Sequence, residues 1–531
     1  MNHFTTNNEQ WVDPSEFTKI QNIEFSKNKT AYWKDGHLIG WNAGKNKWDR
    51  KGGQQVKLVS QYCENYLTSH FLKSEHDISK INPSKRLVYG ITRDHETQDY
   101  AVIEKLEVRC SLCNREWMSS RWCRGFYSDH FESEFKNWTS DDTDIDTFIR
   151  EAQTSAEFPE QVLEWIPESH LTKFTEIGQG GYGTVSKAYW EKGRIYKRDF
   201  IENKWERSGP MWVALKSIDE EEGSTAAFLK EAKAMNRCLK NDVYFLNFYG
   251  ISRLPDTNKY LIVMRYFEEG DLRKYIYSNS VTNSWVNRID RLWSIAIDLR
   301  TLHRADLVHR DLHSGNVLFG SDRRSFIADF GLACKDGQAQ EDDSKGVLPY
   351  VAPEVLCRQP YTRAADVYSF GIIMWEFTSY QSPFGTIEHN CDLAITIHGG
   401  LRPKVIKDTP GCYVRLMKQC WDSKLANRPT AHSLADTLEK WLQIICGKCE
   451  TKCDDKDIWD QFNLAEQKRQ KNPSLIKPYS EELHPSVSLT SRILPKIYLP
   501  IQMTYEEKFT IDEFLKDYEN NIDENNISML S

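Results

Sequence analysis

Long apolar runs are missing from this 531-residue chain. No stretch of about 18 consecutive apolar residues occurs, so no membrane-spanning helix is predicted. Residues 1–13 lack the charged and apolar regions of a signal peptide. The 13 cysteines are odd in number and follow no framework of spacings, which favours a reducing compartment. Basic residues are not in excess, because the net charge is −8. We therefore expect a cytoplasmic protein that contacts neither membrane nor nucleic acid.

Apolar residues are nevertheless frequent enough, at 40%, to build cores. The C-terminal end differs from the rest, because residues 504–531 carry eight acidic and two basic side chains and prolines occur between 473 and 500. This composition predicts that residues 446–531 form a mostly disordered acidic tail. Residues 1–10 are predicted to be a flexible start.

The most informative stretch is the run HRDLHSGN at residues 309–316, which is followed by DFG at residues 329–331. These two motifs place Asp311, Asn316 and Asp329 at the spacing of a site that takes a proton from a hydroxyl group and holds magnesium. Either motif alone is weak, so the order of the other motifs along the chain decides.

Glycines recur upstream at Gly178, Gly180 and Gly183, and Val185 follows them. This G-x-G-x-x-G-x-V pattern lies between two apolar segments and predicts two strands joined by a loop. Because glycine has no Cβ, the backbone of such a loop can approach phosphate oxygens closely.

A single lysine, Lys216, ends the apolar strand predicted at residues 213–216. Its ammonium group can reach the α and β phosphates of a nucleotide as a point charge. Glu231 lies in the helix predicted at residues 226–239 and is placed to pair with Lys216.

With these motifs in order, residues 165–445 resemble the eukaryotic protein kinase family, nearest to its tyrosine-kinase-like branch. The resemblance implies an α+β bilobal fold, with an antiparallel sheet and helix in the N-lobe and a mainly helical C-lobe. It implies transfer of the γ-phosphate of Mg-ATP to a hydroxyl of a protein substrate in signal transduction. The residues implied in catalysis are Lys216, Glu231, Asp311, Asn316 and Asp329, with Asp311 as proton acceptor and Asn316 and Asp329 as Mg²⁺ ligands.

The resemblance also implies a nucleotide pocket. The residues expected around the adenine are Val185 and Ala214 above it, Leu318 below it, Met264 behind it, and Arg265 and Phe267, whose backbone bonds its edge. Asp271 is expected to be a helix N-cap, with a ribose contact as the alternative.

Later positions resemble structural anchors of the family. Glu354 closes an Ala-Pro-Glu motif and is expected to pair with a buried Arg428, and Asp366 is expected to bond the backbone of the catalytic loop. The Ala-Pro-Glu segment and its arginine belong to protein-substrate kinases, which argues against a small-molecule kinase.

The type of acceptor hydroxyl is less clearly marked. His313 replaces the lysine that serine/threonine kinases usually have, and Val347 replaces a threonine. The markers of tyrosine kinases are incomplete too. The Pro349-Tyr350 turn favours serine or threonine, with tyrosine as the alternative.

A regulatory site is also suggested. Arg310 precedes the catalytic aspartate, and Ser344 is the only serine or threonine between Asp329 and Tyr350. Ser344 follows three acidic residues, 341–343, which either form a solvated loop or partly replace a loop phosphate.

An internal repeat lies upstream. Residues 31–60 match residues 188–217 at twelve positions with a constant offset of 157, and residues 89–93 match 249–253 at an offset of 160. Residues 11–108 are therefore predicted to be a degenerate copy of a kinase N-lobe. Val59 stands at the position of Lys216 and Ser74 at that of Glu231, so this copy is not expected to bind ATP well. It either docks on the kinase domain or a partner, which would suit a signalling scaffold, or is a duplication without a role.

Residues 109–164 complete the predicted organisation as a cysteine-containing segment and a helical connector. Cys110, Cys113 and Cys123, with His130, have part of the spacing of a zinc site, but thiols without metal are favoured. Cys446, Cys449 and Cys453 fit a metal site less well. Residues 140–142 predict a helix start, and Ile145, Phe148, Ile149 and Ala152 predict one buried face. The connector and the HRDLHSGN variant resemble a large family of fungal kinases.

Overall fold

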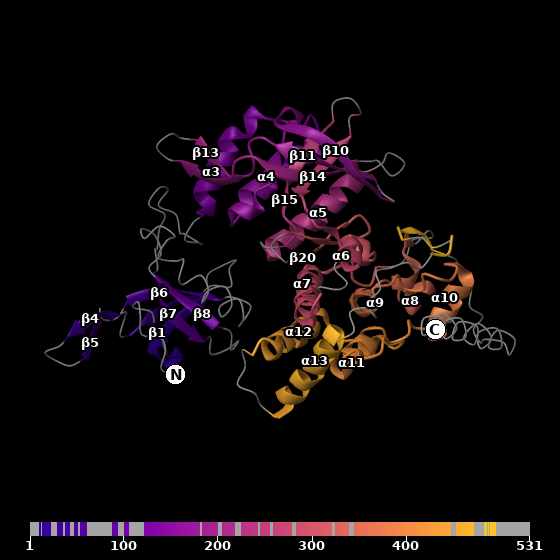
Figure 1. The fold of residues 1–531 in the computed structure, drawn as a ribbon. Coiled ribbons are helices and arrows are strands. Elements are labelled where there is room, and N and C mark those ends of the chain that lie inside the picture. Colours follow the sequence, from indigo (N-terminus) through magenta and orange to yellow (C-terminus); the bar gives the residue numbers. More distant parts are fainter. Residues whose placement is uncertain are drawn as a thin grey trace. The chain divides into compact units, whose positions relative to one another are not determined.

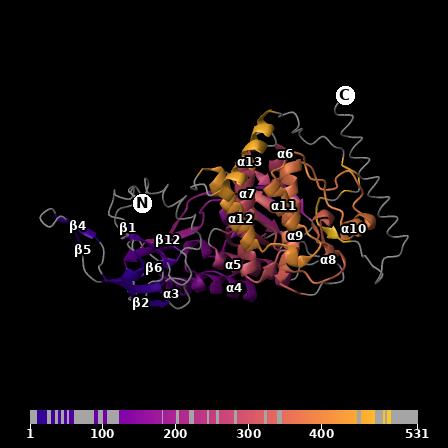
Figure 2. The ribbon, with the colours of Figure 1, turned by 90° about the horizontal axis from the view of Figure 1, so that it is seen from below.

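The computed structural model describes residues 10–11, 13–22, 29–34, 38–42, 47–50, 54–60, 88–93, 100–105, 122–180, 183–199, 204–217, 225–242, 245–254, 257, 259–278, 283–320, 324–338, 345–447, 453–471, 483–485, 487 and 489–494. The chain divides into two compact units (Figures 1 and 2). One unit is formed by residues 1–137 with 154–159, and the other by residues 138–153 with 160–531.

The first unit contains a six-stranded sheet in the order β1-β7-β8-β6-β3-β2. Its strands are β1 (Gln10–Trp11), β2 (Phe17–Asn22), β3 (Lys29–Trp33), β6 (Gln54–Ser60), β7 (Val88–Arg93) and β8 (Tyr100–Lys105). A separate hairpin, β4 (Leu38–Asn42) with β5 (Lys47–Arg50), and the helices η1 (Pro14–Glu16), α3 (Arg124–Glu134) and η3 (Phe135–Asn137) complete it. Ala31 and Trp33 in β3, and Val56 and Leu58 in β6, are buried, because residues two apart in a strand share one face.

The second unit opens with a six-stranded sheet in the order β10-β11-β14-β16-β15-β9. Its strands are β9 (Glu164–Trp165), β10 (Leu171–Gly180), β11 (Gly183–Trp190), β14 (Met211–Ser217), β15 (Phe248–Arg253) and β16 (Tyr260–Arg265). The hairpin β12 (Ile195–Asp199) with β13 (Lys204–Arg207), and the helices η4 (Pro159–Gln161), η5 (Glu168–His170) and α5 (Thr225–Asn241), lie in the same part of the sequence.

The two sheets share one topology. Each consists of five antiparallel strands in the same order, with one parallel strand added at an edge. This edge strand is β1 beside β7 in the first sheet and β9 beside β15 in the second. The register agrees too, since Ala31 pairs with Val56 as Ala188 pairs with Val213, at the predicted offset of 157. The structure thus shows two sheets of one design, and the derivation of the first from a kinase N-lobe stays a prediction that this likeness supports.

The connector helix α4 (Thr143–Ser155) was predicted and is confirmed. The Asp142 carboxylate accepts the N–H groups of Asp144 at 2.9 Å and Ile145 at 3.2 Å, which starts the helix. The predicted apolar stripe of this helix is buried and belongs to the same hydrophobic cluster as Phe228 and Leu229 of α5. Residues 143–153 of α4 therefore pack on the N-lobe of the second unit.

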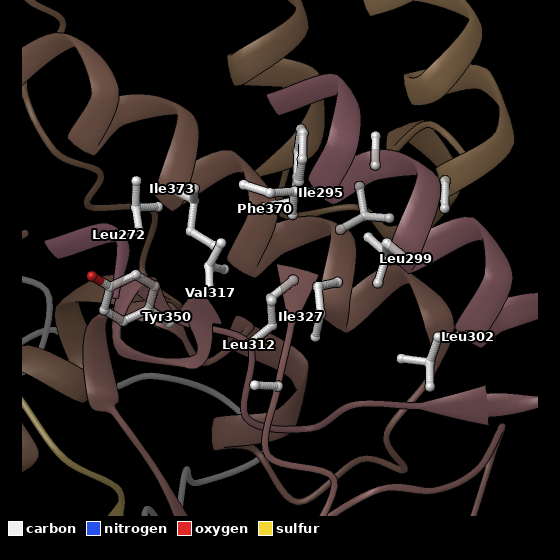
Figure 3. Close-up of a cluster of buried hydrophobic side chains, with 14 of the residues drawn as sticks. Leu272, Ile295, Leu299, Leu302, Leu312, Val317, Ile327, Tyr350, Phe370 and Ile373 are labelled. Atoms are coloured by element: carbon white, nitrogen blue, oxygen red, sulfur yellow. The ribbon is translucent and has the colours of Figure 1, made fainter. Parts of the chain in front are cut away.

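A mainly helical lobe follows the second sheet, as expected for the bilobal α+β fold. Its helices are α6 (Leu272–Ser278), α7 (Trp285–Arg304), η7 (Ser314–Asn316), η8 (Leu348–Tyr350), α8 (Pro353–Leu356), α9 (Arg363–Ser379), α10 (Cys391–His398), α11 (Gly411–Cys420), η9 (Leu425–Asn427), α12 (Ala431–Ile445) and α13 (Cys453–Lys471). Its short strands are β17 (Gly270–Asp271), β18 (Leu307–Val308), β19 (Val317–Phe319), β20 (Ser325–Ile327), β21 (Cys334–Lys335), β22 (Lys345–Gly346) and β23 (Arg492–Ile493). Side chains of α7, α9, β19 and β20 form a buried cluster together with Leu312 (Figure 3). This packing gives the loop that carries Leu312 a rigid base.

The prediction of a mostly disordered tail after residue 445 is wrong for part of its length. Residues 453–471 form α13, where Phe462 and Ala465 are buried. Glu466 accepts the N–H of Trp285 at 3.1 Å, and Gln461 accepts that of Cys412 at 2.7 Å, so α13 caps two other helices. Residues 492–493 form β23. The acidic stretch 504–531 and residues 1–9 lie outside the described residues.

Two further expectations concern membrane-spanning helices and metal sites. Within the described ranges no helix has the length and apolarity needed to cross a membrane. The same ranges contain no group of three or more His, Cys, Asp or Glu side chains placed to hold a metal. Cys110, Cys113 and Cys449 lie outside the described residues, so the structure does not test the expectation of thiols without metal or its alternative, a zinc site. Cys123 is buried and Cys446 is exposed.

Candidate active site

A buried aspartate, Asp366, binds the backbone of the loop that contains Asp311. Asp366, in the first turn of α9, accepts the backbone N–H of His309 at 2.9 Å and that of Arg310 at 3.1 Å, one with each carboxylate oxygen. The same carboxylate lies 2.9 Å from His303 Nε2. The predicted role of Asp366 as an anchor of the loop backbone is confirmed.

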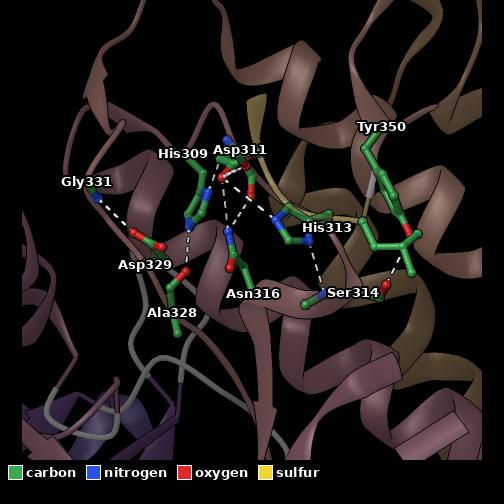
Figure 4. A network of polar contacts seen from close by, with 12 residues as sticks. His309, Asp311, His313, Ser314, Asn316, Ala328, Asp329, Gly331 and Tyr350 are labelled. Atoms are coloured by element: carbon green, nitrogen blue, oxygen red, sulfur yellow. Dashed lines mark hydrogen bonds and ion pairs between the residues drawn. The ribbon is translucent and has the colours of Figure 1, made fainter. Parts of the chain in front are cut away.

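Asp311 and Asn316 face one another across the loop (Figure 4). Asn316 Nδ2 donates to the Asp311 carbonyl at 2.9 Å and to its Oδ2 at 3.3 Å. His309 accepts the Asp311 N–H through Nδ1 at 3.3 Å, so its Nε2, 3.0 Å from the Ala328 carbonyl, carries the ring proton. These bonds fix the orientation of the Asp311 backbone and side chain.

Lys216 joins strand β14, helix α5 and the DFG segment. Its Nζ lies 2.8 Å from Glu231 Oε1 and 2.6 Å from Asp329 Oδ1, so the predicted pairing with Glu231 is present. Burial favours the neutral amine, but the Asp329 and Glu231 carboxylates outweigh it, and the pKa of Lys216 is raised. The ammonium therefore stays charged at neutral pH. Asp329 has a left-handed φ of 64°, and its Oδ1 also accepts the Gly331 N–H at 3.3 Å.

Asp311 is held in its ionised form. Burial alone would raise its pKa, but His313, the hydroxyl group of Ser491 and His309 together outweigh burial, so the pKa of Asp311 is lowered. His313 is itself buried, and its Nδ1 accepts the Gly315 N–H at 3.0 Å. Its Nε2 therefore carries the proton and lies 3.7 Å from Asp311 Oδ2. His313 thus faces the Asp311 carboxylate.

The residues expected around a nucleotide lie on neighbouring strands. Ala214 pairs with Met264, and Val185 pairs with Lys216, which places one pocket residue beside the lysine. The backbone N–H of Arg265 already donates to the Asn247 carbonyl at 3.0 Å. If the backbone of Arg265 contacts adenine, it must therefore do so through its carbonyl oxygen.

The other residues expected around a nucleotide lie on other elements of the domain. Phe267 is buried against Phe326 with ring centroids 4.9 Å apart, and Leu318 is part of β19. Asp271 Oδ1 accepts the Lys274 N–H at 2.9 Å, so its predicted role as the N-cap of α6 is confirmed. At the end of β10, Gly178 pairs with Val185 and Gly180 pairs with Gly183, both of which lie at the start of β11.

The predicted pair of Glu354 and Arg428 is confirmed as a bidentate ion pair. Arg428 Nη1 and Nη2 lie 2.7 and 2.8 Å from the two Glu354 oxygens. Arg428 also donates to the carbonyls of Asp422 at 2.8 Å and Ala364 at 2.9 Å. This pair ties the end of the activation segment to the loop before α12.

Comparison with known proteins shows the family of this chain. The family model described as "Protein tyrosine and serine/threonine kinase" matches residues 171–438, about half of the chain. The chain belongs to the protein kinase family.

Individual relatives cover shorter parts. The chain is 32% identical over 185 residues to the serine/threonine/tyrosine-protein kinase HT1 of Arabidopsis thaliana, which covers 34% of this chain and 47% of that protein. It is 28% identical over 308 residues to mitogen-activated protein kinase kinase kinase 7 of Mus musculus, which covers 56% of this chain and 49% of that protein. The aligned part thus spans less than half the length of these curated relatives. Protein kinases of this family generally use ATP and Mg²⁺.

The kinase domain contains a buried network that sequence reasoning missed. Ser314, directly before Gly315, donates to Glu376 Oε1 at 2.9 Å and lies 3.0 Å from the Tyr350 hydroxyl group. The network joins the catalytic loop, helix α9 and the activation segment. Glu376 lies in the middle of an apolar helix, and only the unfavourable burial of a carboxylate there could have drawn attention to it.

Glu376 makes the stability of the kinase domain depend on pH. Burial raises its pKa from 4.5 to about 7, and nearby Arg273 opposes the shift only in part. At Glu376 the folded protein therefore binds a proton more tightly than the unfolded chain, so the contribution of this group to stability is full below pH 4.5 and is lost as pH rises through about 7. At 1.36 kcal/mol per pKa unit, the loss is at most about 3 kcal/mol.

We expect Glu376→Gln to be less sensitive to pH than the wild type. Urea denaturation at pH 5 and pH 8 should show a smaller drop in the free energy of unfolding for this variant. The exposed Glu388→Gln protein is the matched control and should keep the wild-type drop. An equal drop in Glu376→Gln and wild type would contradict the assignment to Glu376.

Proposed function

We propose that this chain is an ATP-dependent protein kinase that transfers the γ-phosphate of Mg-ATP to a serine or threonine hydroxyl of a protein, with tyrosine as the alternative acceptor. The observation that carries the proposal is the convergence of Lys216, Asp311 and Asp329 in one site. Lys216 and Asp329 lie 113 residues apart in the sequence, yet they form an ion pair of 2.6 Å. The sequence motifs alone could not supply this contact.

Each residue then has a role that its surroundings support. Ionised Asp311 accepts the proton of the acceptor hydroxyl, and Asn316 and His309 hold it in position. The Lys216 ammonium, kept in place by Glu231, neutralises phosphate charge. No covalent enzyme intermediate is required, because positioning and charge stabilisation account for phosphoryl transfer.

The residues fit a bound Mg²⁺. Asn316 uses its amide nitrogen on Asp311, so its amide oxygen remains as a ligand, and Asp329 supplies a carboxylate. Mg²⁺ needs only one or two protein ligands when phosphates and water complete its shell. When bound, Mg²⁺ would neutralise charge on the phosphates.

The expected result with the full chain is incorporation of radiolabel from γ-labelled ATP into a generic protein substrate. Phosphoamino-acid analysis should give phosphoserine or phosphothreonine, whereas phosphotyrosine alone would reverse the preference. Lys216→Met should reduce transfer to background, because it removes the charge at the phosphates. Equal signals from the wild type and Lys216→Met would overturn the proposal and favour a signalling scaffold.

A docking role for the first sheet is a second candidate. That sheet has the strand order of the kinase N-lobe, but it has valine in place of the lysine. Val59 pairs with Val102 in the first sheet, as Lys216 pairs with Ile262 in the second. A sheet of this design without the lysine suits attachment to the kinase domain or to a partner protein better than catalysis.

A further inference from the structure

A short segment far downstream of the kinase motifs lies at the catalytic aspartate. The segment consists of residues 489–494, which we call the acceptor segment, and it contains β23. The hydroxyl group of Ser491 donates a hydrogen bond to Asp311 Oδ2. The two residues are 180 positions apart in the sequence. A serine hydroxyl therefore occupies the place in which the proposed function requires the acceptor hydroxyl.

The acceptor segment is held on the C-terminal side of Ser491 by the activation segment. β23 pairs antiparallel with β22, with Arg492 opposite Gly346 and Ile493 opposite Lys345. Leu494 is buried in the main hydrophobic cluster of the kinase domain. An extended peptide that adds a strand to the edge of a protein is a general mode of peptide recognition.

The N-terminal side of Ser491 is held as well. Arg273, in α6, donates from Nη2 to the Leu489 carbonyl at 3.1 Å. Further upstream, the His484 N–H donates to the Gly385 carbonyl at 3.0 Å. Arg492 also bonds the His389 carbonyl. Backbone groups on both sides of Ser491 are thus hydrogen-bonded to the kinase domain. These bonds fix the backbone at Ser491 and thereby the position of its hydroxyl group.

We propose that Ser491 is a phosphorylation site of this chain's own active site, modified within the same molecule. The inference rests on the proposed function. In the step, Asp311 accepts the proton from Ser491 Oγ, and Oγ forms a bond to the γ-phosphorus of ATP. The bond between that phosphorus and the oxygen bridging to the β-phosphate breaks, ADP leaves with the electron pair, and phosphoserine remains at position 491.

Phosphorylation of Ser491 also displaces the acceptor segment from its position at Asp311. Unmodified, the acceptor segment occupies the position at Asp311 that a protein substrate needs, so it competes with substrates at a high effective concentration. A phosphate at Ser491 adds a charge of about −1.5 to −2 at the place where the Ser491 hydroxyl group bonds the Asp311 carboxylate. This repulsion disfavours the bound position, and the phosphorylated segment leaves the site.

The test uses the dephosphorylated full chain incubated with Mg-ATP, followed by peptide mapping by mass spectrometry. Phosphate should appear at Ser491 in the wild type and in Thr490→Ala, a matched control that removes the neighbouring exposed hydroxyl. The first-order rate constant should stay constant over a hundredfold range of protein concentration, because the step is intramolecular. No phosphate at Ser491, or a rate constant proportional to concentration, would overturn the proposal.

A second readout does not depend on detecting the phosphate. Amide hydrogen exchange at residues 345–346 and 492–493 should be slow before incubation with Mg-ATP and at least roughly tenfold faster afterwards, because β22 and β23 separate. Ser491→Ala should keep slow exchange after the same incubation. Faster exchange in that variant would contradict release by phosphorylation.

Transfer to a generic protein is measured in the same samples. If the wild type phosphorylates that protein while Ser491 stays unmodified, the inference fails and the proposed function stands. If neither is phosphorylated, the proposed function fails as well.

Discussion

Asp311→Asn is expected to lower the rate of phosphate transfer roughly 10²–10⁴-fold, the usual contribution of a general base. The asparagine has nearly the same shape, so the loop should keep its anchors on Asp366. It cannot accept a proton from the acceptor hydroxyl, which is the function that the ionised carboxylate of Asp311 supplies. The lowered pKa of Asp311 means that the wild-type base is ionised at neutral pH, so raising the pH should not rescue the variant.

The measurement is the initial rate of transfer from ATP to a generic protein, combined with nucleotide affinity from a binding titration. Affinity should change little, because Lys216 and Asp329 are intact. Asp306→Asn is a matched control, because the Asp306 side chain is 50% exposed and lies five residues before Asp311. Its left-handed φ of 58° is one that asparagine tolerates. A wild-type rate in Asp311→Asn would refute the assignment, and an equal loss in Asp306→Asn would mean that the effect is structural.

Those parts of the site that belong to motifs of fixed spacing could be predicted from the sequence. The glycine loop, the lysine at the end of a strand and the HRDLHSGN run each have a fixed spacing, and their order predicts one site. The structure adds the distances that spacing cannot give, such as 2.6 Å between Lys216 and Asp329. It also shows what His313 does: its Nε2 faces Asp311, a placement that depends on the bond from Gly315.

The acceptor segment could not have been predicted from the sequence. Residues 489–494 have no helical periodicity, and β23 is only two residues long. What fixes Ser491 at Asp311 is a set of bonds over large sequence separations: the backbone pairing with β22, the bond from Arg273 of α6 to the Leu489 carbonyl, and the bond from the Arg492 side chain to the loop before α10. A composition rich in proline and polar residues indicates disorder for a chain considered alone, but partners elsewhere in the fold can satisfy its backbone.

Helix α13 was missed for a related reason. Few of its side chains are buried, chiefly Phe462 and Ala465, so the apolar stripe that identifies an amphipathic helix is weak. Its attachment depends on polar side chains that bond the first turns of two other helices, as Glu466 does with Trp285. Such contacts depend on the tertiary fold and leave no periodic pattern in the sequence.

Arg428→Met is expected to destabilise the kinase domain by about 3–5 kcal/mol, the usual cost of breaking a buried ion pair. The Arg428 side chain is 0% exposed and Glu354 is 4% exposed, so the methionine variant leaves a buried carboxylate without its partner. Two backbone carbonyls, at Asp422 and Ala364, also lose their donor. Urea denaturation monitored by tryptophan fluorescence measures the change.

The matched control is Arg363→Met. Arg363 is 44% exposed and pairs with Asp306 at 2.8 Å and with Asp336 at 3.1 Å. Both pairs are open to solvent, so their loss should cost less than about 1 kcal/mol each. A double variant, Arg428→Met with Glu354→Gln, should be more stable than Arg428→Met alone, because no unpaired charge is then buried. If Arg428→Met were as stable as Arg363→Met, the pair would not hold the fold. Because Glu354 ends the activation segment that contains β22, loss of the pair should also weaken the strand that holds Ser491 at Asp311.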